Sequence, residues 1–112
     1  MTILIVEDNA SVRRLIRVVV GDLADSVFEC ADGMDAMAAY DEHRPDFVLM
    51  DIEMKRLDGI QATRRIVAGW PAAKIIVLSN HDDAGLREAA EKAGACGYVR
   101  KENLLEIVSL LR

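Results

Sequence analysis

The chain has 112 residues, and 52% of them are hydrophobic, which is too many for a disordered segment. The net charge of -5 argues against a nucleic-acid-binding surface, which is usually basic. No apolar run approaches the ~20 residues that cross a bilayer. Length and even composition predict a single domain over residues 1–112. Cys30 and Cys96 lack CxxC spacing, so we expect two buried free thiols.

Three uninterrupted apolar runs predict strands that are buried on both faces. They are Ile3–Val6, Phe47–Met50 and Ile75–Leu78. A strand with one wet face would alternate apolar and polar residues, so continuous runs are typical of a parallel sheet covered on both sides. Two shorter runs, Val27–Phe28 and Tyr98–Val99, suit flanking strands.

The segments between these runs have helical periodicity. In the first segment, apolar residues recur at i, i+3, i+4, i+7 and i+8 and predict one stripe facing the core: Val12, Leu15, Ile16, Val19 and Val20. Asn9 or Ser11 would cap this helix at its N-terminus. Further helices are expected over residues 33–42, 59–68, 84–93, where Gly94 would be the C-cap, and 102–112.

The alternation of strands and helices predicts an α/β fold, with a parallel sheet and helices on both faces. Sheets of this kind bind their ligands beyond the carboxyl ends of the strands. Polar residues follow the apolar runs at those ends, and we expect them to meet at one edge: Glu7, Asp8, Asp51, Ser79 and Lys101.

Carboxylates gathered at one edge repel one another and raise each other's pKa unless positive charge offsets them. Lys101 supplies one such charge, and Mg²⁺, a hard cation that prefers oxygen ligands, complements the rest. We expect Asp8 and Asp51 to bind Mg²⁺ directly, and Glu7 to bind it directly or through water. The backbone carbonyl of Glu53 would complete the protein ligands. Such a site suits phosphoryl transfer, with the carboxylate of Asp51 as the nucleophile.

Several stretches, in this order and spacing, resemble the receiver domain of two-component response regulators over the whole chain. They are residues 3–9, residues 48–54 with Asp58-Gly59, residues 76–79 and residues 94–101. The resemblance implies a flavodoxin-like (CheY-like) doubly wound sheet of five parallel strands in the order 2-1-3-4-5, with five helices. It also implies a phosphorelay switch, which takes a phosphoryl group from a sensor histidine kinase or a phosphotransfer protein.

The resemblance gives each polar residue at the strand ends a role. Asp51 matches the phosphate-accepting aspartate, and the preceding acids Glu7 and Asp8 match the pair that holds Mg²⁺. Ser79 matches the switch hydroxyl, and Lys101 matches the lysine that contacts the phosphate. Phosphorylation would then change the face formed by the fourth helix, the fifth strand and the fifth helix.

Tyr98 matches the aromatic residue whose ring turns inward on activation, although its place in a short apolar run also suits a core residue. The chain departs from the family pattern elsewhere. Many receivers have proline at the positions of Lys55 and Glu102, and a small residue where Asn80 stands. These differences affect partner surfaces or the lifetime of the phosphate, and they remove no residue of the phosphoryl chemistry.

The stretches Ser79–Asp83 and Gly97–Glu102 are most similar to receivers that carry a LuxR-type helix-turn-helix domain. The resemblance implies transcription regulation through a DNA-binding domain that is not within these residues, so this domain itself would not contact nucleic acid. We expect a cytoplasmic location without membrane contact, because the N-terminus lacks the pattern of a signal peptide. The resemblance also allows a homodimer that forms on phosphorylation.

Two alternatives stand beside the signalling switch. A Mg²⁺-dependent phosphatase of the haloacid-dehalogenase type also uses an aspartate after a buried strand, but it needs an acid two residues later, where Glu53 is a loose substitute. A receiver scaffold that binds partners without phosphorylation would be favoured if Asp51 or the acidic pair were missing. We therefore expect a phosphoacceptor domain with self-catalysed phosphotransfer and autodephosphorylation, and not an enzyme with turnover.

Overall fold

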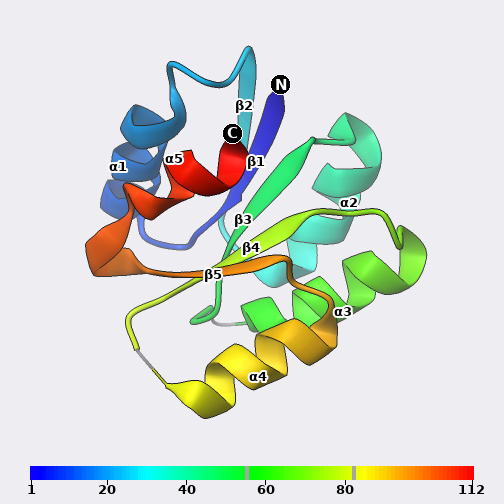
Figure 1. Cartoon of the computed structure of the whole chain (residues 1–112). Helices are drawn as coiled ribbons and strands as arrows, with labels where there is room; N and C mark the ends of the chain where they lie inside the picture. Colours follow the sequence, from blue (N-terminus) through cyan, green and yellow to red (C-terminus); the bar gives the residue numbers. More distant parts are fainter. Residues whose placement is uncertain (55, 82) are drawn as a thin grey trace.

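Helices and strands alternate along the chain in the computed structural model, which describes residues 1–54, 56–81 and 83–112 (Figure 1). Lys55, one of the departures named above, lies outside the described residues. The strands are β1 (Thr2–Val6), β2 (Ser26–Cys30), β3 (Phe47–Asp51), β4 (Ile75–Ser79) and β5 (Gly97–Arg100). The helices are α1 (Ala10–Val20), α2 (Gly33–His43), α3 (Gly59–Gly69), α4 (Ala84–Ala93), a 3-10 helix η1 (Lys101–Asn103) and α5 (Glu106–Leu111).

The five strands form one parallel sheet in the order β2-β1-β3-β4-β5, as the family resemblance implied. The register pairs Val6 of β1 with Met50 of β3, and Asp51 of β3 with Leu78 of β4. The carboxyl ends of these strands therefore lie level with one another. This alignment places the residues that follow β1, β3 and β4 at one edge of the sheet.

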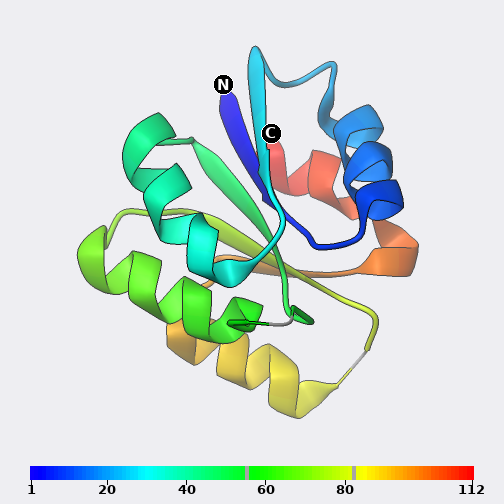
Figure 2. The same cartoon turned by 180° about the vertical axis from the view of Figure 1, so that it is seen from behind.

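Each apolar run contributes to two cores, because successive residues of a strand point to opposite faces of the sheet. One core contains Leu4 and Val48 and lies under α2, α3 and α4, while the other contains Ile3 and Leu49 and lies under α1 and α5. The two helical layers are seen from opposite sides in Figures 1 and 2. All four of these side chains are fully buried, and each such burial stabilises the fold by roughly 1.5–3 kcal/mol.

The polar residues between strand and helix also start the helices. Asn9 caps α1 by accepting hydrogen bonds from two backbone N–H groups, and Asp32, Asp58 and Asp83 cap α2, α3 and α4 through their own side-chain oxygens. Gly94 ends α4 with a φ of 107°, a left-handed conformation that favours glycine. These caps anchor the N-termini of α1, α2, α3 and α4 at the carboxyl edge of the sheet.

Three details differ from the sequence prediction. Leu15, predicted to face the core, is 54% exposed because it lies toward α5 at the border of the α1 stripe. The last helix does not begin at Glu102: the chain first forms η1 over Lys101–Asn103, and α5 begins at Glu106. Both cysteines are free, but Cys96 is exposed, and only Cys30 is partly buried, which raises the pKa of its thiol to about 12.

Candidate functional site

The carboxyl edge of the sheet gathers side chains from four strand ends. Glu7 follows β1, Asp51 ends β3 and Ser79 ends β4, and all three are fully buried. Lys101 follows β5 and points toward the same place. Asp8, next to Glu7, is exposed to solvent. The predicted juxtaposition of acids, hydroxyl and amine is thus present in the folded chain.

Lys101 joins two of the buried acids. Its Nζ atom lies 2.8 Å from Glu7 Oε1 and 2.8 Å from Asp51 Oδ1. Burial lowers the pKa of Lys101, but the hydrogen bonds to Asp51 and Glu7 outweigh it and leave that pKa above the ordinary lysine value. The lysine is therefore charged and holds the ends of β1, β3 and β5 together.

One lysine does not balance the acidic cluster. Burial, followed by the neighbouring Asp51, raises the pKa of Glu7, and burial followed by Glu7 raises the pKa of Asp8. One carboxylate oxygen from each of Glu7, Asp8 and Asp51 lies within 4.8 Å of the others. Burial and the neighbouring carboxylates thus both disfavour the charged forms of Glu7 and Asp8.

Asp51 itself offers an oxygen to a ligand. Its Oδ1 atom is 3.2 Å from the backbone nitrogen of Glu53, which donates a hydrogen bond, and it also contacts Lys101. Its Oδ2 atom is buried and accepts no hydrogen bond from any residue that the structure describes. A buried carboxylate of this kind, beside two further carboxylates, fits the oxygen coordination of a hard divalent cation such as Mg²⁺.

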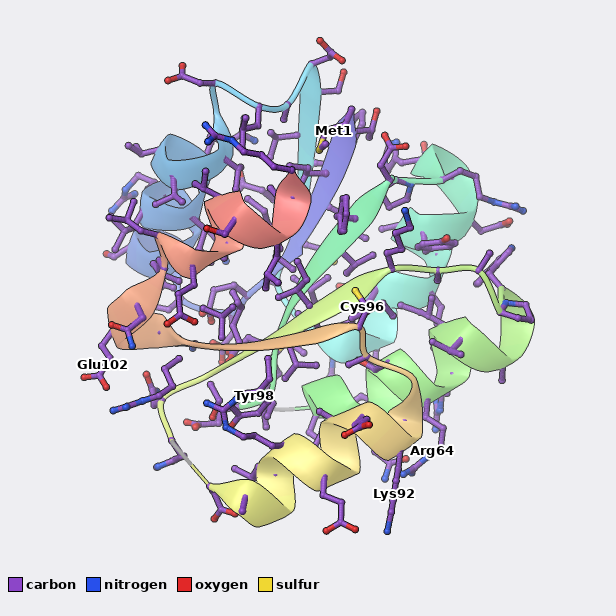
Figure 3. The ribbon with its side chains drawn as sticks, viewed as in Figure 1. Met1, Arg64, Lys92, Cys96, Tyr98 and Glu102 are labelled. Atoms are coloured by element: carbon purple, nitrogen blue, oxygen red, sulfur yellow. The ribbon has the colours of Figure 1, made fainter. Side chains whose placement is uncertain are left out.

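Ser79 and Tyr98 meet the loop after β4 from two directions. Ser79 Oγ accepts a hydrogen bond of 3.0 Å from the backbone N–H of His81, and the Tyr98 hydroxyl donates one of 2.8 Å to the His81 carbonyl. The ring of Tyr98 lies 4.5 Å from the guanidinium carbon of Arg87 on α4. Tyr98 thus extends from β5 toward α4 and is partly buried (Figure 3).

Two contacts at this edge were not predicted. His81 Nε2 lies 3.2 Å from Glu53 Oε1, so an ion pair joins the loops after β3 and β4 at the rim of the cluster when His81 is protonated. Arg13 of α1 donates a hydrogen bond of 2.7 Å to the backbone carbonyl of Glu7. No local pattern marks either contact, because each depends on the path of a loop or the reach of a long side chain.

Asn80, which stands where many receivers have a small residue, is exposed.

A parallel sheet in this order, with acids, a hydroxyl and a lysine at its carboxyl edge, defines a class of phosphorelay signalling domain. The family model described as "Response regulator receiver domain" matches residues 3–112. The chain therefore belongs to the response regulator receiver domain family.

Named relatives and solved structures agree with this assignment. The chain is 41% identical over 71 residues to the transcriptional regulatory protein DegU of Brevibacillus brevis, covering 63% of this chain and 30% of that protein. It is 36% identical over 102 residues to the chemotaxis protein CheY of Listeria monocytogenes, covering 90% of this chain and 86% of that protein. A crystal structure of a LuxR-family two-component response regulator from Aurantimonas sp. SI85-9A1 is 32% identical, with a TM-score of 0.87, and the match covers 98% of this chain and 84% of that one.

The predicted similarity to LuxR-type receivers is confirmed by these neighbours, and the domain is a signalling domain of phosphorelay systems. The matched residues cover less than a third of the length of the DegU protein. Among the described helices, none combines the length and the apolar character that a membrane span requires.

Proposed function

We propose that residues 1–112 form one receiver unit in which Asp51 is the phosphoacceptor. One observation carries this proposal: Asp51 is fully buried at the sheet edge, and its Oδ2 atom accepts no hydrogen bond from the described residues, while Lys101 and two further acids surround it. A carboxylate in this setting is available to an incoming electrophile. The phosphorus–nitrogen bond of a partner's phosphohistidine breaks as a bond forms between phosphorus and the Asp51 oxygen.

The other residues of the cluster supply charge and hydrogen bonds to this reaction. Glu7, Asp8 and Asp51 would hold Mg²⁺, together with the backbone carbonyl of Glu53. The bound ion would neutralise charge on the transferred phosphoryl group. Lys101, which lies 2.8 Å from Asp51 Oδ1, binds a second phosphoryl oxygen.

Phosphorylation then changes the loops that meet at the site. It adds roughly -1.5 to -2 charges to a cluster that is already acidic. Ser79 leaves the His81 N–H to bind the new oxygens, and Tyr98 turns inward to fill the space behind it. The surface formed by α4, β5 and α5 changes as a result, through a shift between two existing conformations.

We infer the partner from the family and the output from the named relatives. A sensor histidine kinase or a phosphotransfer protein supplies the phosphoryl group. The similarity to LuxR-family regulators and to a protein named as a transcriptional regulator supports an output in transcription through a DNA-binding domain outside this chain. We place the protein in the cytoplasm and expect a homodimer to form on phosphorylation.

The chain acts as a switch and not as a phosphatase. A haloacid-dehalogenase-type phosphatase requires an acid two residues after its nucleophile to transfer protons. The acid at that position, Glu53, is half exposed and pairs with His81 at 3.2 Å, at the rim of the site.

The proposal is tested with acetyl phosphate and Mg²⁺. We expect the intact protein to gain the mass of one phosphoryl group, and a peptide map to place it on Asp51. Asp51→Asn should gain none, and chelation of Mg²⁺ by EDTA should prevent the gain in the native protein. A folded protein that gains no mass, or gains it equally in Asp51→Asn, would falsify the proposal.

A further inference from the structure

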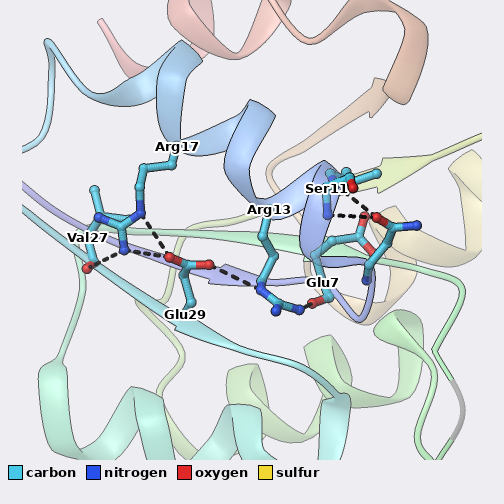
Figure 4. Close-up of polar contacts among 8 residues, drawn as sticks. Glu7, Ser11, Arg13, Arg17, Val27 and Glu29 are labelled. Atoms are coloured by element: carbon cyan, nitrogen blue, oxygen red, sulfur yellow. Dashed lines mark hydrogen bonds and ion pairs between the residues drawn. The ribbon is translucent and has the colours of Figure 1, made fainter.

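An arginine outside the acidic cluster holds the backbone that carries its acidic pair. Arg13 of α1 donates a hydrogen bond of 2.7 Å from Nη1 to the carbonyl oxygen of Glu7, and its Nε atom donates one of 3.1 Å to Glu29 of β2 (Figure 4). The Arg13 side chain is mostly buried, with 22% of its surface exposed. It therefore connects helix, edge strand and site in a single fixed position.

Glu29 is itself held by a second arginine. Arg17, one helical turn after Arg13, donates a hydrogen bond of 2.8 Å from Nε to the other carboxylate oxygen of Glu29, and its Nη2 atom lies 2.5 Å from the same oxygen. Both oxygens of Glu29 are thus occupied by arginines of α1 (Figure 4). A carboxylate bonded on both oxygens has little freedom to move, so it fixes the orientation of the Arg13 guanidinium group.

The peptide of Glu7 lies just beyond the end of β1, where the regular strand ladder stops. Its N–H donates a hydrogen bond of 3.1 Å to the carbonyl of Cys30, and its carbonyl accepts the hydrogen bond from Arg13. These two bonds fix both ends of the residue. The position of this backbone determines the direction of the Glu7 side chain and the position of the Asp8 backbone nitrogen.

We propose that Arg13, braced by Glu29, is a positioning residue for the cation site formed by the acidic pair. This inference rests on the proposed function, in which Glu7 and Asp8 hold Mg²⁺. Arg13 touches neither the metal nor the phosphoryl group. It acts on the backbone that aims the ligands, and loss of such supporting contacts typically costs 10–100-fold in metal affinity.

The sign of the effect separates positioning from simple electrostatics. A cationic guanidinium group near the site repels Mg²⁺, so its charge alone makes binding weaker. If charge were its only influence, removal of Arg13 would tighten Mg²⁺ binding. A positioning role predicts weaker Mg²⁺ binding, because Glu7 and Asp8 are no longer held in the orientation that binds the cation.

The test measures Mg²⁺ affinity by isothermal titration calorimetry, without any phosphodonor. For Arg13→Ala we expect a Kd about tenfold higher than that of the native protein. Arg14→Ala is the matched control: it removes the same charge from the next residue of α1, whose side chain bonds Ser11 within the helix. Its Kd should stay the same or fall slightly.

Two further variants separate positioning from loss of structure. Arg13→Lys keeps the charge and one donor nitrogen, so its Mg²⁺ affinity should lie between that of Arg13→Ala and that of the native protein. Glu29→Gln weakens the brace, and its effect should not add to that of Arg13→Ala in the double variant, because both changes break one network. Unfolding in urea, followed by circular dichroism, gives the stability of each variant alongside its Kd.

The positioning role and the proposed function can fail separately. A Kd for Arg13→Ala equal to or lower than that of the native protein, in a folded sample, overturns the positioning role and leaves the proposed function intact. The same holds if Arg14→Ala weakens binding as much as Arg13→Ala. If the native protein itself binds no Mg²⁺, the proposed function fails, and this inference fails with it.

Discussion

Lys101 Nζ lies 2.8 Å from Asp51 Oδ1, although the two residues come from opposite halves of the chain. The same nitrogen lies 2.8 Å from Glu7 Oε1, so one ammonium group contacts two buried carboxylates. The contact has a structural role before any phosphate arrives, because it joins the residue after β1, the end of β3 and the turn after β5. Its removal should therefore affect stability as well as chemistry.

Lys101→Met tests this structural role. The substitution keeps much of the side-chain length but leaves Glu7 and Asp51 without their shared cation, and loss of one partner of a buried ion pair costs about 3 kcal/mol. We expect urea denaturation at neutral pH without Mg²⁺ to show a loss of this order. Added Mg²⁺ should restore part of it by replacing the missing charge. Unchanged stability in both buffers would contradict the structural role.

Gly59 lies where α3 begins, against the backbone of Asp51. A Cβ atom at this position would come within 2.0 Å of the Asp51 carbonyl oxygen, so Gly59→Ala requires the backbone to shift and should lower the unfolding free energy by about 1–3 kcal/mol. Gly69, at the other end of the same helix, has open space where a Cβ atom would stand, with nothing within 4 Å, and Gly69→Ala should raise stability by up to about 1 kcal/mol. Equal effects of the two substitutions on urea midpoints would contradict this explanation.

Arg87 holds Tyr98 toward α4, with 4.5 Å between its guanidinium carbon and the ring centre. A cation–π contact at an exposed site contributes about 0.5–1 kcal/mol. If Tyr98 turns inward on activation, Arg87→Ala should increase the affinity for beryllofluoride, at saturating Mg²⁺, by a factor of about 2–5. Lys92→Ala, which removes a cation from the same helix, is the control. Equal affinities for Arg87→Ala and the native protein would show that the contact does not oppose the switch.

The ion pair between Asp32 and Arg56 should make a pH-dependent contribution to stability. Arg56 hydrogen-bonds the Asp32 carboxylate and holds its pKa below the ordinary value of 3.8. Because the folded pKa is the lower one, the contribution is complete above the ordinary value and disappears as the pH falls through the folded pKa. Asp32→Asn keeps an oxygen to cap α2 but loses the charge. It should therefore be less stable than the native protein at pH 6, and the difference should shrink by pH 3.

A double-mutant cycle with Arg56 isolates the contribution of the Asp32–Arg56 ion pair. In the Arg56→Gln background, Asp32→Asn should produce a difference that varies less between pH 6 and pH 3, because only the backbone N–H groups of Met34 and Asp35 then still lower the Asp32 pKa. Denaturation midpoints in urea at both pH values give the four stabilities. A difference that stays constant with pH in the native background would show that the pair contributes nothing to the pH dependence.

The sheet could be predicted because its central strands are continuous apolar runs. Residues 3–6 and 75–78 fall within β1 and β4, since only a strand covered on both faces tolerates such runs. The fourth helix runs from Ala84 to Ala93 as predicted, and it ends at Gly94, the predicted C-cap; the N-cap Asp83 was not predicted. The strand order came from the family resemblance, as no local pattern encodes it.

The site could be predicted only as far as the strand ends. The register of neighbouring strands brings Glu7 and Asp51 together, so their positions after apolar runs were sufficient. The contact of Arg13 with the Glu7 carbonyl was not predictable, because an arginine on a helix reaches many directions. The exposure of Leu15 shows the same limit: periodicity gives the direction of a helical stripe, but the packing of α5 decides how wide a stripe is covered.

β5 is the last strand along the chain and lies at the edge of the sheet, and this order bears on how the chain folds during synthesis. Residues 7, 8 and 51 leave the ribosome well before residue 101, and domains generally begin to fold from the N-terminal side. A partly folded chain without β5 thus has three neighbouring acids and lacks the lysine whose charge offsets two of them. Docking of β5 brings Lys101 to these acids and reduces their repulsion. The electrostatic interaction therefore favours completion of the sheet in the nascent chain.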